Sequence, residues 1–441
     1  MVASQGFVRS WSASALSMLG TRTLSVIYPL LAMALTGSAA WAGWVVFASM
    51  LPGLLCYLPA GTISDRLGPR RVMLWSEALR ALLMALLCGT MLAGMLRIEH
   101  LLAVAFLEGG LAVVTSVAEA ALVTTTARQA RLHTALAMHE TTVHAIALAG
   151  RPLGGALYAL GPLTAFLSNA FFFAMSAGVL VRPPRAAPET GPQTGPETGP
   201  GPETGERRPM LRETVMGFRE VWRHPFIRSA TILTALINLI VQSLTVVSIS
   251  HMTGGGLNPA VIGTILSASG VGGIIGGLIS PRRRRISRKI HEKASRRMSA
   301  AIFAEWVGLT RHGRSMLLVH AWMCSLALLL TAVTGIAPLA FAVALLMIGL
   351  AGGLSNVTIR TVLSDVPHHM TARVVGVSRL VSYGVAALGP PLFTVFYERA
   401  GAGLTVGTLA LAMVVVALSM TVVPPFRKSL SPNWATRKVT A

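Results

Sequence analysis

Apolar segments long enough to cross a lipid bilayer recur along the whole chain and limit the possible folds. A spanning helix takes about 20 apolar residues. Hydrophobic residues make up 53% of the 441 positions and charged residues only 12%, which is too little charge to cover a water-soluble fold of this size. Two sets of six segments are found, at 10–35, 41–63, 72–95, 99–124, 134–160 and 163–181, then at 227–250, 259–280, 315–334, 338–360, 372–397 and 402–423.

A stretch rich in glycine, proline, threonine and glutamate separates the two sets. It reads ETGPQTGPETGPGPETGE within residues 183–208, a composition that cannot hold a helix or a strand. Residues 209–223 instead have the pattern of a short amphipathic surface helix. The sequence predicts an N-terminal bundle over 1–182, a cytoplasmic linker with a surface helix over 183–225, a C-terminal bundle over 226–424 and a cytoplasmic tail over 425–441.

Positive charge is concentrated on one side of the predicted membrane. The net charge of +21 would suggest nucleic acid for a soluble chain, but basic residues are typical of the cytoplasmic loops of a membrane protein. The loops predicted outside hold only Arg97 and Arg399. We therefore expect a multi-pass protein of a bacterial inner membrane, with both termini cytoplasmic, the lipid bilayer as its partner and no nucleic acid.

Residues 282–310 form a basic insert in the C-terminal bundle, with nine basic against two acidic side chains. Its apolar residues recur near helical spacing. We favour a basic amphipathic helix on the anionic inner leaflet, and a regulatory or partner-binding insert is the alternative.

A glycine- and arginine-rich loop follows the second segment, with the sequence GTISDRLGPRRVML at 61–74. A glycine here allows a close helix approach, and the aspartate can accept hydrogen bonds from the amides of a facing helix. This pattern resembles the signature loop of the major facilitator superfamily, although Pro69 replaces a usual basic residue. The resemblance implies a gating latch; a plain positive-inside loop is the alternative. Glu77 and Arg80 are one turn apart near the cytoplasmic end of the next helix, and we interpret them as partners of this loop. The residues of this gating set are Gly61, Asp65, Arg66, Gly68, Arg70, Arg71, Glu77 and Arg80.

The fifth segment contains GRPLGG at 150–155. It resembles the Gly-Pro-x-x-Gly-Gly motif of exporters in the same superfamily, with Arg151 in the usual proline position. The motif residues are Gly150, Pro152, Gly154 and Gly155. The resemblance implies export, and ordinary packing of small residues between helices is the alternative.

An internal repeat supports two similar halves. GRPLGGALYALG from Gly150 resembles GPPLFTVFYERAG from Gly389, which pairs Pro152 with Pro391 and Tyr158 with Tyr397. Two parallel six-helix repeats are typical of this superfamily. The fold class predicted is therefore an all-α polytopic membrane protein with the major facilitator fold.

Ionisable residues inside predicted spans are costly and mark function. Glu108, Arg151 and Arg22 fall at similar depth and are predicted to form a cluster facing the central cavity. We expect Glu108 to carry a coupling proton and Arg151 to tune its proton affinity; a permanent structural ion pair is the alternative. Deeper candidates for a proton ladder are Glu119, Glu140 and His144.

The function predicted is secondary active transport, with proton-coupled efflux of a hydrophobic small molecule by alternating access. No phosphate-binding loop and no Cys/His metal spacing occur, so we expect no enzyme, cofactor or metal, and a monomer. An uptake permease and a non-transporting sensor or scaffold are the alternatives. Weak candidates for the substrate cavity are Tyr28, Asn238, Gln242, Asn356 and Arg379.

Overall fold

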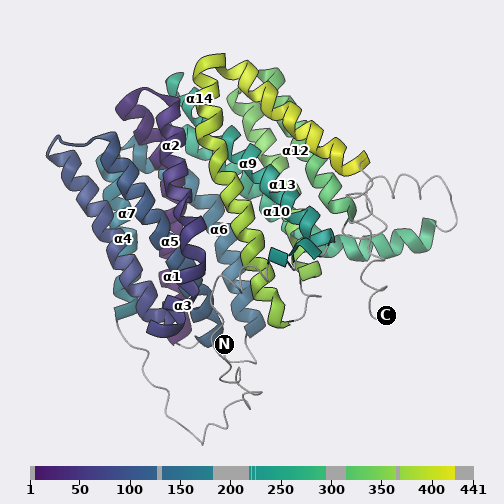
Figure 1. The fold of residues 1–441 in the computed structure, drawn as a ribbon, viewed down its shortest axis with the longest axis horizontal. Helices are drawn as coiled ribbons and strands as arrows, with labels where there is room; N and C mark the ends of the chain where they lie inside the picture. The colour runs from purple at the N-terminus through teal and green to yellow at the C-terminus, as the bar shows by residue number, and fades with distance from the viewer. Residues whose placement is uncertain are drawn as a thin grey trace, which may run out of the picture.

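The structure is a computed structural model in which the chain forms two helical bundles side by side (Figure 1). It describes residues 5–126, 132–181, 218–219, 221–223, 225–294, 314–363 and 368–422. The N-terminal half contains α1 (Gln5–Thr36), α2 (Ala39–Met50), α3 (Pro52–Leu67), α4 (Pro69–Leu92), α5 (Ile98–Thr126), α6 (Leu132–Ala159) and α7 (Pro162–Val181). The C-terminal half contains α9 (Pro225–Gly254), α10 (Pro259–Ala294), α12 (Arg314–Thr334), α13 (Pro338–Leu363) and α14 (His368–Val422).

Ten of the described segments are long and apolar enough to cross a membrane. The last, Gly376–Val422, has 47 residues and bends at Gly401, whose φ of 79° and ψ of 174° are not helical, so it is compatible with two crossings. The 28-residue helix α6 lies outside those ten, and α2 and α3 follow each other through Leu51 and Pro52. The arrangement is compatible with the twelve predicted helices and confirms an all-helical polytopic membrane protein.

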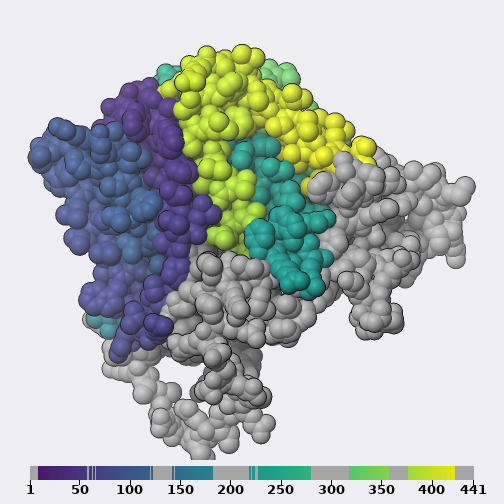
Figure 2. Space-filling model, in the orientation of Figure 1, coloured from purple at the N-terminus to yellow at the C-terminus, as the bar shows by residue number. Residues whose placement is uncertain are grey.

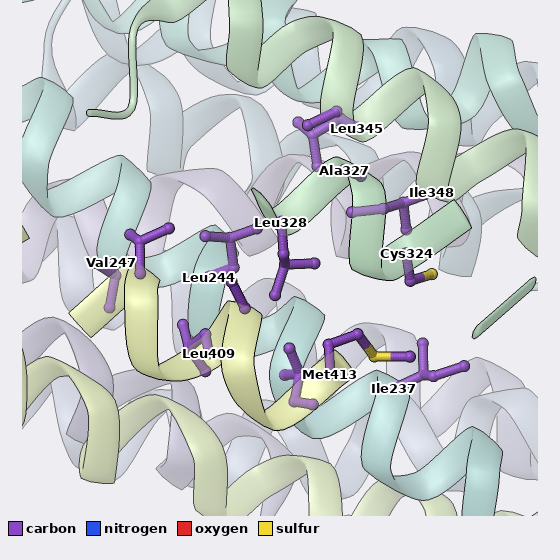
Figure 3. Packing of buried hydrophobic residues seen from close by; sticks show 14 of the residues in the cluster. Ile237, Leu244, Val247, Cys324, Ala327, Leu328, Leu345, Ile348, Leu409 and Met413 are labelled. Carbon is purple, nitrogen blue, oxygen red and sulfur yellow. The ribbon is translucent and has the colours of Figure 1, made fainter. Parts of the chain in front are cut away.

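The hydrophobic core is largest in the C-terminal half. One cluster joins α9, α12, α13 and α14 through side chains such as Leu244, Cys324, Leu328 and Met413 (Figure 3). The N-terminal half has two smaller clusters, one around Phe166 and one around Met73. Buried aliphatic side chains therefore pack the helices of each half, and the clusters also cross between the halves through Val26 and Leu30 of α1 and Val246 of α9.

The predicted repeat appears as matching helix contacts. In the N-terminal half α6 packs on α1, and in the C-terminal half α14 packs on α9. A Cβ on Gly150 would lie 2.6 Å from the Cβ of Arg22 on α1, and a Cβ on Gly389 would lie 2.7 Å from the carbonyl oxygen of Leu239 on α9. Both glycines thus let the same pair of helices approach within its own half.

The two halves meet along α6–α10 and α2–α14. Figure 2 shows the purple and blue half against the green and yellow half along this boundary. We call the end of the bundle with the α1–α2, α6–α7 and α9–α10 connections the short-loop end, which lies at the top of Figure 1. There a Cβ on Gly155 would lie 3.0 Å from the Cα of Gly263, and a Cβ on Gly43 would meet Thr394 and the carbonyl of Pro390.

A polar contact reinforces the same end. The Glu398 carboxylate of α14 accepts hydrogen bonds from the Ser38 hydroxyl at 2.6 Å and from the Ala40 amide at 3.0 Å. These donors begin α2, so a side chain of one half caps a helix of the other. The halves are in close contact at the short-loop end.

Most of the predicted linker lies outside the described residues, as do the tail 425–441 and residues 295–310 of the basic insert. Residues 282–294 of the insert continue α10 in the backbone. Of the predicted surface helix, 218–219 and 221–223 are described and helical. Val221 is buried in the core of the C-terminal half, while Phe218 and Trp222 stack with ring centroids 5.0 Å apart and are partly exposed.

Candidate functional site

A cavity of about 420 Å³ lies between the two halves. Helices α1 to α6 of the N-terminal half contribute to its wall, and α9, α10 and α14 contribute from the other half. Its charged lining residues are Arg22, Arg80, Glu108, Glu119 and Arg151. Much of the remaining wall is apolar, as expected for a small-molecule site with a few polar groups.

Arg80 of α4 is the centre of a buried charged cluster. Its Nη2 lies 2.6 Å from Glu108 Oε1 of α5, and its Nη1 lies 2.8 Å from Glu77 Oε1 one turn earlier on α4. The side chains of Arg80 and Glu77 are fully buried, and that of Glu108 is 5% exposed. The residues that bear these charges therefore sit away from water, where each needs a partner.

The guanidinium of Arg80 has a hydrogen bond for each of its five N–H donors. Nε and Nη2 donate to Glu108, and Nη1 donates to Glu77. The other two bonds reach α1, at Ser17 Oγ (2.9 Å) and Thr21 Oγ1 (2.6 Å). This network joins α1, α4 and α5.

An aromatic ring covers the same guanidinium. The Cζ of Arg80 lies 3.9 Å from the ring centroid of Phe173 on α7, which is a cation–π distance. A Cβ on Gly20 would lie 2.8 Å from Cζ of that ring, so the glycine on α1 leaves room for it. The seventh helix thus closes the cluster on one side.

Glu77 accepts more bonds than its position in the sequence suggested. Its Oε1 accepts from Ser17 at 2.8 Å and from Thr115 of α5 at 3.1 Å, in addition to Arg80. Its Oε2 is buried and has no hydrogen-bond partner among the described residues. Two carboxylates and one guanidinium leave the cluster one negative charge in excess when both acids are ionised.

This geometry corrects two predictions. Glu77 and Arg80 are not partners of the signature loop, because α4 begins at Pro69 and Arg80 lies eleven residues further on, roughly 16 Å along the helix. Glu108 pairs with Arg80 and not with Arg151, because α6 packs on α1 and α10 and only slightly on α5. Although α5 and α6 follow each other in the sequence, they are hardly in contact in the fold.

Arg151 instead reaches the other half. Its Nη1 donates to Ser269 Oγ at 2.6 Å and to the carbonyl of Leu266 at 3.1 Å, both on α10. Arg22 of α1 lines the cavity as well. The predicted cluster of Glu108, Arg151 and Arg22 is therefore one lining set of the cavity, with the arginines apart from the carboxylate.

Glu119, Tyr28 and Gln242 also line the cavity, which is the position predicted for Tyr28 and Gln242. The role of Glu119 as a proton site stays a prediction. Glu119 is buried at 7% exposure. The side chains of Glu140 and His144 lie outside the described ones. Asn238, Asn356 and Arg379 do not line this cavity, and Arg379 and Asn356 are exposed elsewhere on their helices.

Sequence reasoning missed several lining residues, including Ser49, Thr245 and Tyr383. They are uncharged and carry no motif, so nothing in the sequence distinguishes them from other helix residues. Arg80 did carry a signal: an arginine three residues after a glutamate inside an apolar segment is typical of a buried ion pair.

The signature loop holds its own half together. Gly68 joins α3 to α4 with a φ of 83°, a conformation that favours glycine. Arg70 Nη2 donates to the carbonyl of Leu180 at 2.6 Å and so caps the last turn of α7. Among the described residues, a Cβ on Gly61 would meet nothing within 4 Å, so the predicted close approach at Gly61 is not found there.

Three residues of the signature loop remain to be placed. Arg66 and Arg71 are exposed, and the Asp65 side chain lies outside the described ones. The GRPLGG motif lies on α6 at a three-helix junction, where Gly150 and Gly154 face α1 and Gly155 faces α10. Within the described ranges no group of three or more His, Cys, Asp or Glu side chains could hold a metal ion.

The fold and the cavity define a polytopic helical protein of two repeated bundles around a charged central space. The sequence model of the Major Facilitator Superfamily matches residues 10–390. The chain belongs to the major facilitator superfamily and is a membrane transporter of that fold.

Solved transporter structures share the fold at low identity. A point mutant of the nucleoside transporter NupG has a TM-score of 0.65 and 13% identity, over 96% of this chain and 100% of its own. A POT family transporter in complex with 5-aminolevulinic acid has a TM-score of 0.67 and 13% identity, over 97% and 96%. A comparison with curated proteins finds no match.

Proposed function

We propose that this transporter couples the entry of protons to the export of a hydrophobic small molecule by alternating access. The observation that carries the proposal is the buried Glu77–Arg80–Glu108 cluster beside the cavity between the halves. A buried charge cluster with unequal numbers of acids and bases is a natural proton-binding element in a membrane protein.

Binding of one proton would remove the net charge of the cluster. With both acids ionised its formal charge is −1, and a single proton makes it neutral. An uncompensated charge in a water-poor interior is expensive, so protonation changes which cavity conformation is stable. Glu108 lines the cavity and is the carboxylate that a proton reaches first, while Glu77 is fully enclosed.

Alternating access requires that the two halves can close one end of the cavity. Gly155 against Gly263, Gly43 against Thr394 and the Glu398 cap of α2 all join the halves at the short-loop end. We assign this end to the outside, because the basic loops of the sequence lie at the opposite end. The resemblance of GRPLGG to an exporter motif supports the direction of transport.

The test is transport in proteoliposomes that contain a pH-sensitive dye. Ethidium and rhodamine 6G, both hydrophobic cations, represent hydrophobic export substrates; uridine and 5-aminolevulinic acid represent the nucleoside and POT neighbours. We expect a hydrophobic probe to accumulate when the lumen is acidic, with protons leaving as it enters. Accumulation of uridine or 5-aminolevulinic acid only with acid outside would establish uptake, and no flux with any probe would favour a sensor or scaffold.

Two variants on α5 locate the coupling site. Glu108→Gln removes the titratable group beside Arg80, and we expect proton movement to stop while the probe still equilibrates. Glu99→Gln is the matched control, because Glu99 is exposed in the first turn of the same helix. Full coupling in a folded Glu108→Gln protein would remove Glu108 from this role.

A further inference from the structure

Two arginines face the cavity without a carboxylate partner. Both ion pairs among the described side chains belong to Arg80, and neither involves Arg22 or Arg151. Arg151 donates only to neutral acceptors, Ser269 Oγ and the Leu266 carbonyl. Both arginines line the cavity.

Close packing of α6 on α1 brings together the backbone segments that carry the two arginines. Gly150 precedes Arg151, and a Cβ there would lie 2.6 Å from the Cβ of Arg22. One turn on, a Cβ on Gly154 would lie 2.9 Å from the Cα of Thr23. The glycines thus seat α6 directly on α1 at the level of Arg22, and both arginines line the one cavity.

Two positive charges that line one cavity at membrane depth favour an anion in that cavity. Arg80 is the contrasting case of a fully partnered arginine, because it donates five hydrogen bonds, contacts two carboxylates and lies against the Phe173 ring. Arg22 and Arg151 have no such arrangement in the part of the chain that the structure describes. Their remaining donors point to a ligand.

We propose that Arg22 and Arg151 bind the carboxylate of an amphiphilic organic anion, which is the substrate of the cavity. The guanidinium fork matches a carboxylate. The apolar body would lie against the apolar lining side chains Leu24, Val26, Val46, Met50 and Val246. This inference rests on the proposed transport function and names its substrate class. The cavity of about 420 Å³ is within the size of small-molecule sites.

The carboxylates of the cavity and the two arginines without a carboxylate partner come from different helices, and this arrangement is compatible with proton coupling. The lining carboxylates Glu108 and Glu119 belong to α5, whereas Arg22 and Arg151 belong to α1 and α6. Glu108 is already bound by Arg80. An arriving carboxylate would also compete with Ser269 for Arg151, and so would weaken a contact between the halves as the substrate binds.

The test uses two fluorescent probes that differ in one group, dansyl-leucine with a carboxylate and dansyl-leucinamide with a neutral amide. Binding to purified full-length protein in detergent is followed by dansyl fluorescence. We expect the acid to bind about tenfold or more tightly than the amide, the effect of a charge-assisted hydrogen bond. Arg22→Gln should remove this preference and leave amide binding within about twofold, and Arg22→Lys should restore part of it.

Ser269→Ala is the control, because it removes a contact of Arg151 while both positive charges stay. It should keep the preference for the acid. Arg151→Gln should act as Arg22→Gln does, and if that variant does not fold, the Arg22 series decides. Equal binding of acid and amide by the wild type, or a loss shared equally by both probes in Arg22→Gln, would overturn the proposal.

Failure of the transport function gives a different result. The binding assay needs no gradient, so a charge preference without flux would retain the anion site and refute coupled transport. Proton-driven flux of ethidium in a protein that binds neither dansyl probe would retain transport and refute the anion site.

Discussion

The two halves share a packing plan and differ in their chemistry. Among the described residues, the N-terminal half buries four charged side chains, Glu77, Arg80, Glu108 and Glu119, and the C-terminal half buries none. The C-terminal half has the larger apolar cluster, and its buried polar side chains are hydroxyls such as Ser325 and Thr405. The two repeats have matching helix contacts, while the buried charged side chains lie in the N-terminal repeat.

The repeat locates this divergence residue by residue. In the alignment of Gly150 with Gly389, Arg151 corresponds to Pro390 and Gly155 to Thr394. Gly155 and Thr394 both lie where the halves meet, packed against α10 and α2 respectively. The contact surface is the same in both copies, but only the first copy carries a charge into the cavity. The charged lining residues of the cavity therefore come from the N-terminal half, and the C-terminal half contributes uncharged lining residues.

The largest expected effect on stability comes from a substitution that breaks the charged cluster. Arg80→Ala leaves Glu77 and Glu108 buried without their cation, which costs about 3–5 kcal/mol in the free energy of unfolding. Unfolding in detergent by a chemical denaturant measures it. The triple variant Arg80→Met, Glu77→Gln and Glu108→Gln is the control, because it removes charge from all three and should recover most of the loss. Wild-type stability for Arg80→Ala would show that the cluster is not a structural ion pair.

An intermediate effect concerns the contact between the halves. Gly155→Val places a side chain against Gly263 and the carbonyl of Pro259, and overpacking of this kind costs about 1–3 kcal/mol. We expect the short-loop end to open, which lengthens the distance between spin labels at the exposed Leu160 and Leu339. Gly178→Val is the control, since a Cβ there meets nothing within 4 Å. An unchanged distance distribution would mean that Gly155 does not limit closure.

The smallest effect belongs to the neutral half. Ser355 of α13 and His320 of α12 form a hydrogen bond of 2.8 Å, and Ser355 is 1% exposed. Ser355→Ala should cost about 1 kcal/mol and leave proton-coupled flux unchanged, since neither residue lines the cavity. Unfolding and liposome transport measured on the same variant check both parts. Loss of coupling would contradict the assignment of the chemistry to the N-terminal half.

The fold could be predicted to a large degree because each helix carries its own signal. Apolar length indicated the spans, and Gly68 of the predicted loop is the residue that ends α3. Cavity residues were predicted less well. Tyr28, Gln242 and Glu108 line the cavity as predicted, whereas the sequence pattern places Arg80 beside the loop and gives no signal for Tyr383. Which face of a helix points inward depends on its neighbours, and a single sequence does not show them.

Hydrophobic length, glycine spacing and internal repetition are local properties of a chain, and they were sufficient to specify a two-bundle membrane protein. The partners of the charges were decided by packing. Glu108 meets Arg80 because α5 lies against α4, and Arg151 reaches Ser269 because α6 lies between α1 and α10. Electrostatic pairing falls off over a few ångströms, so it depends on which helices are neighbours in space, and only the folded structure determines that.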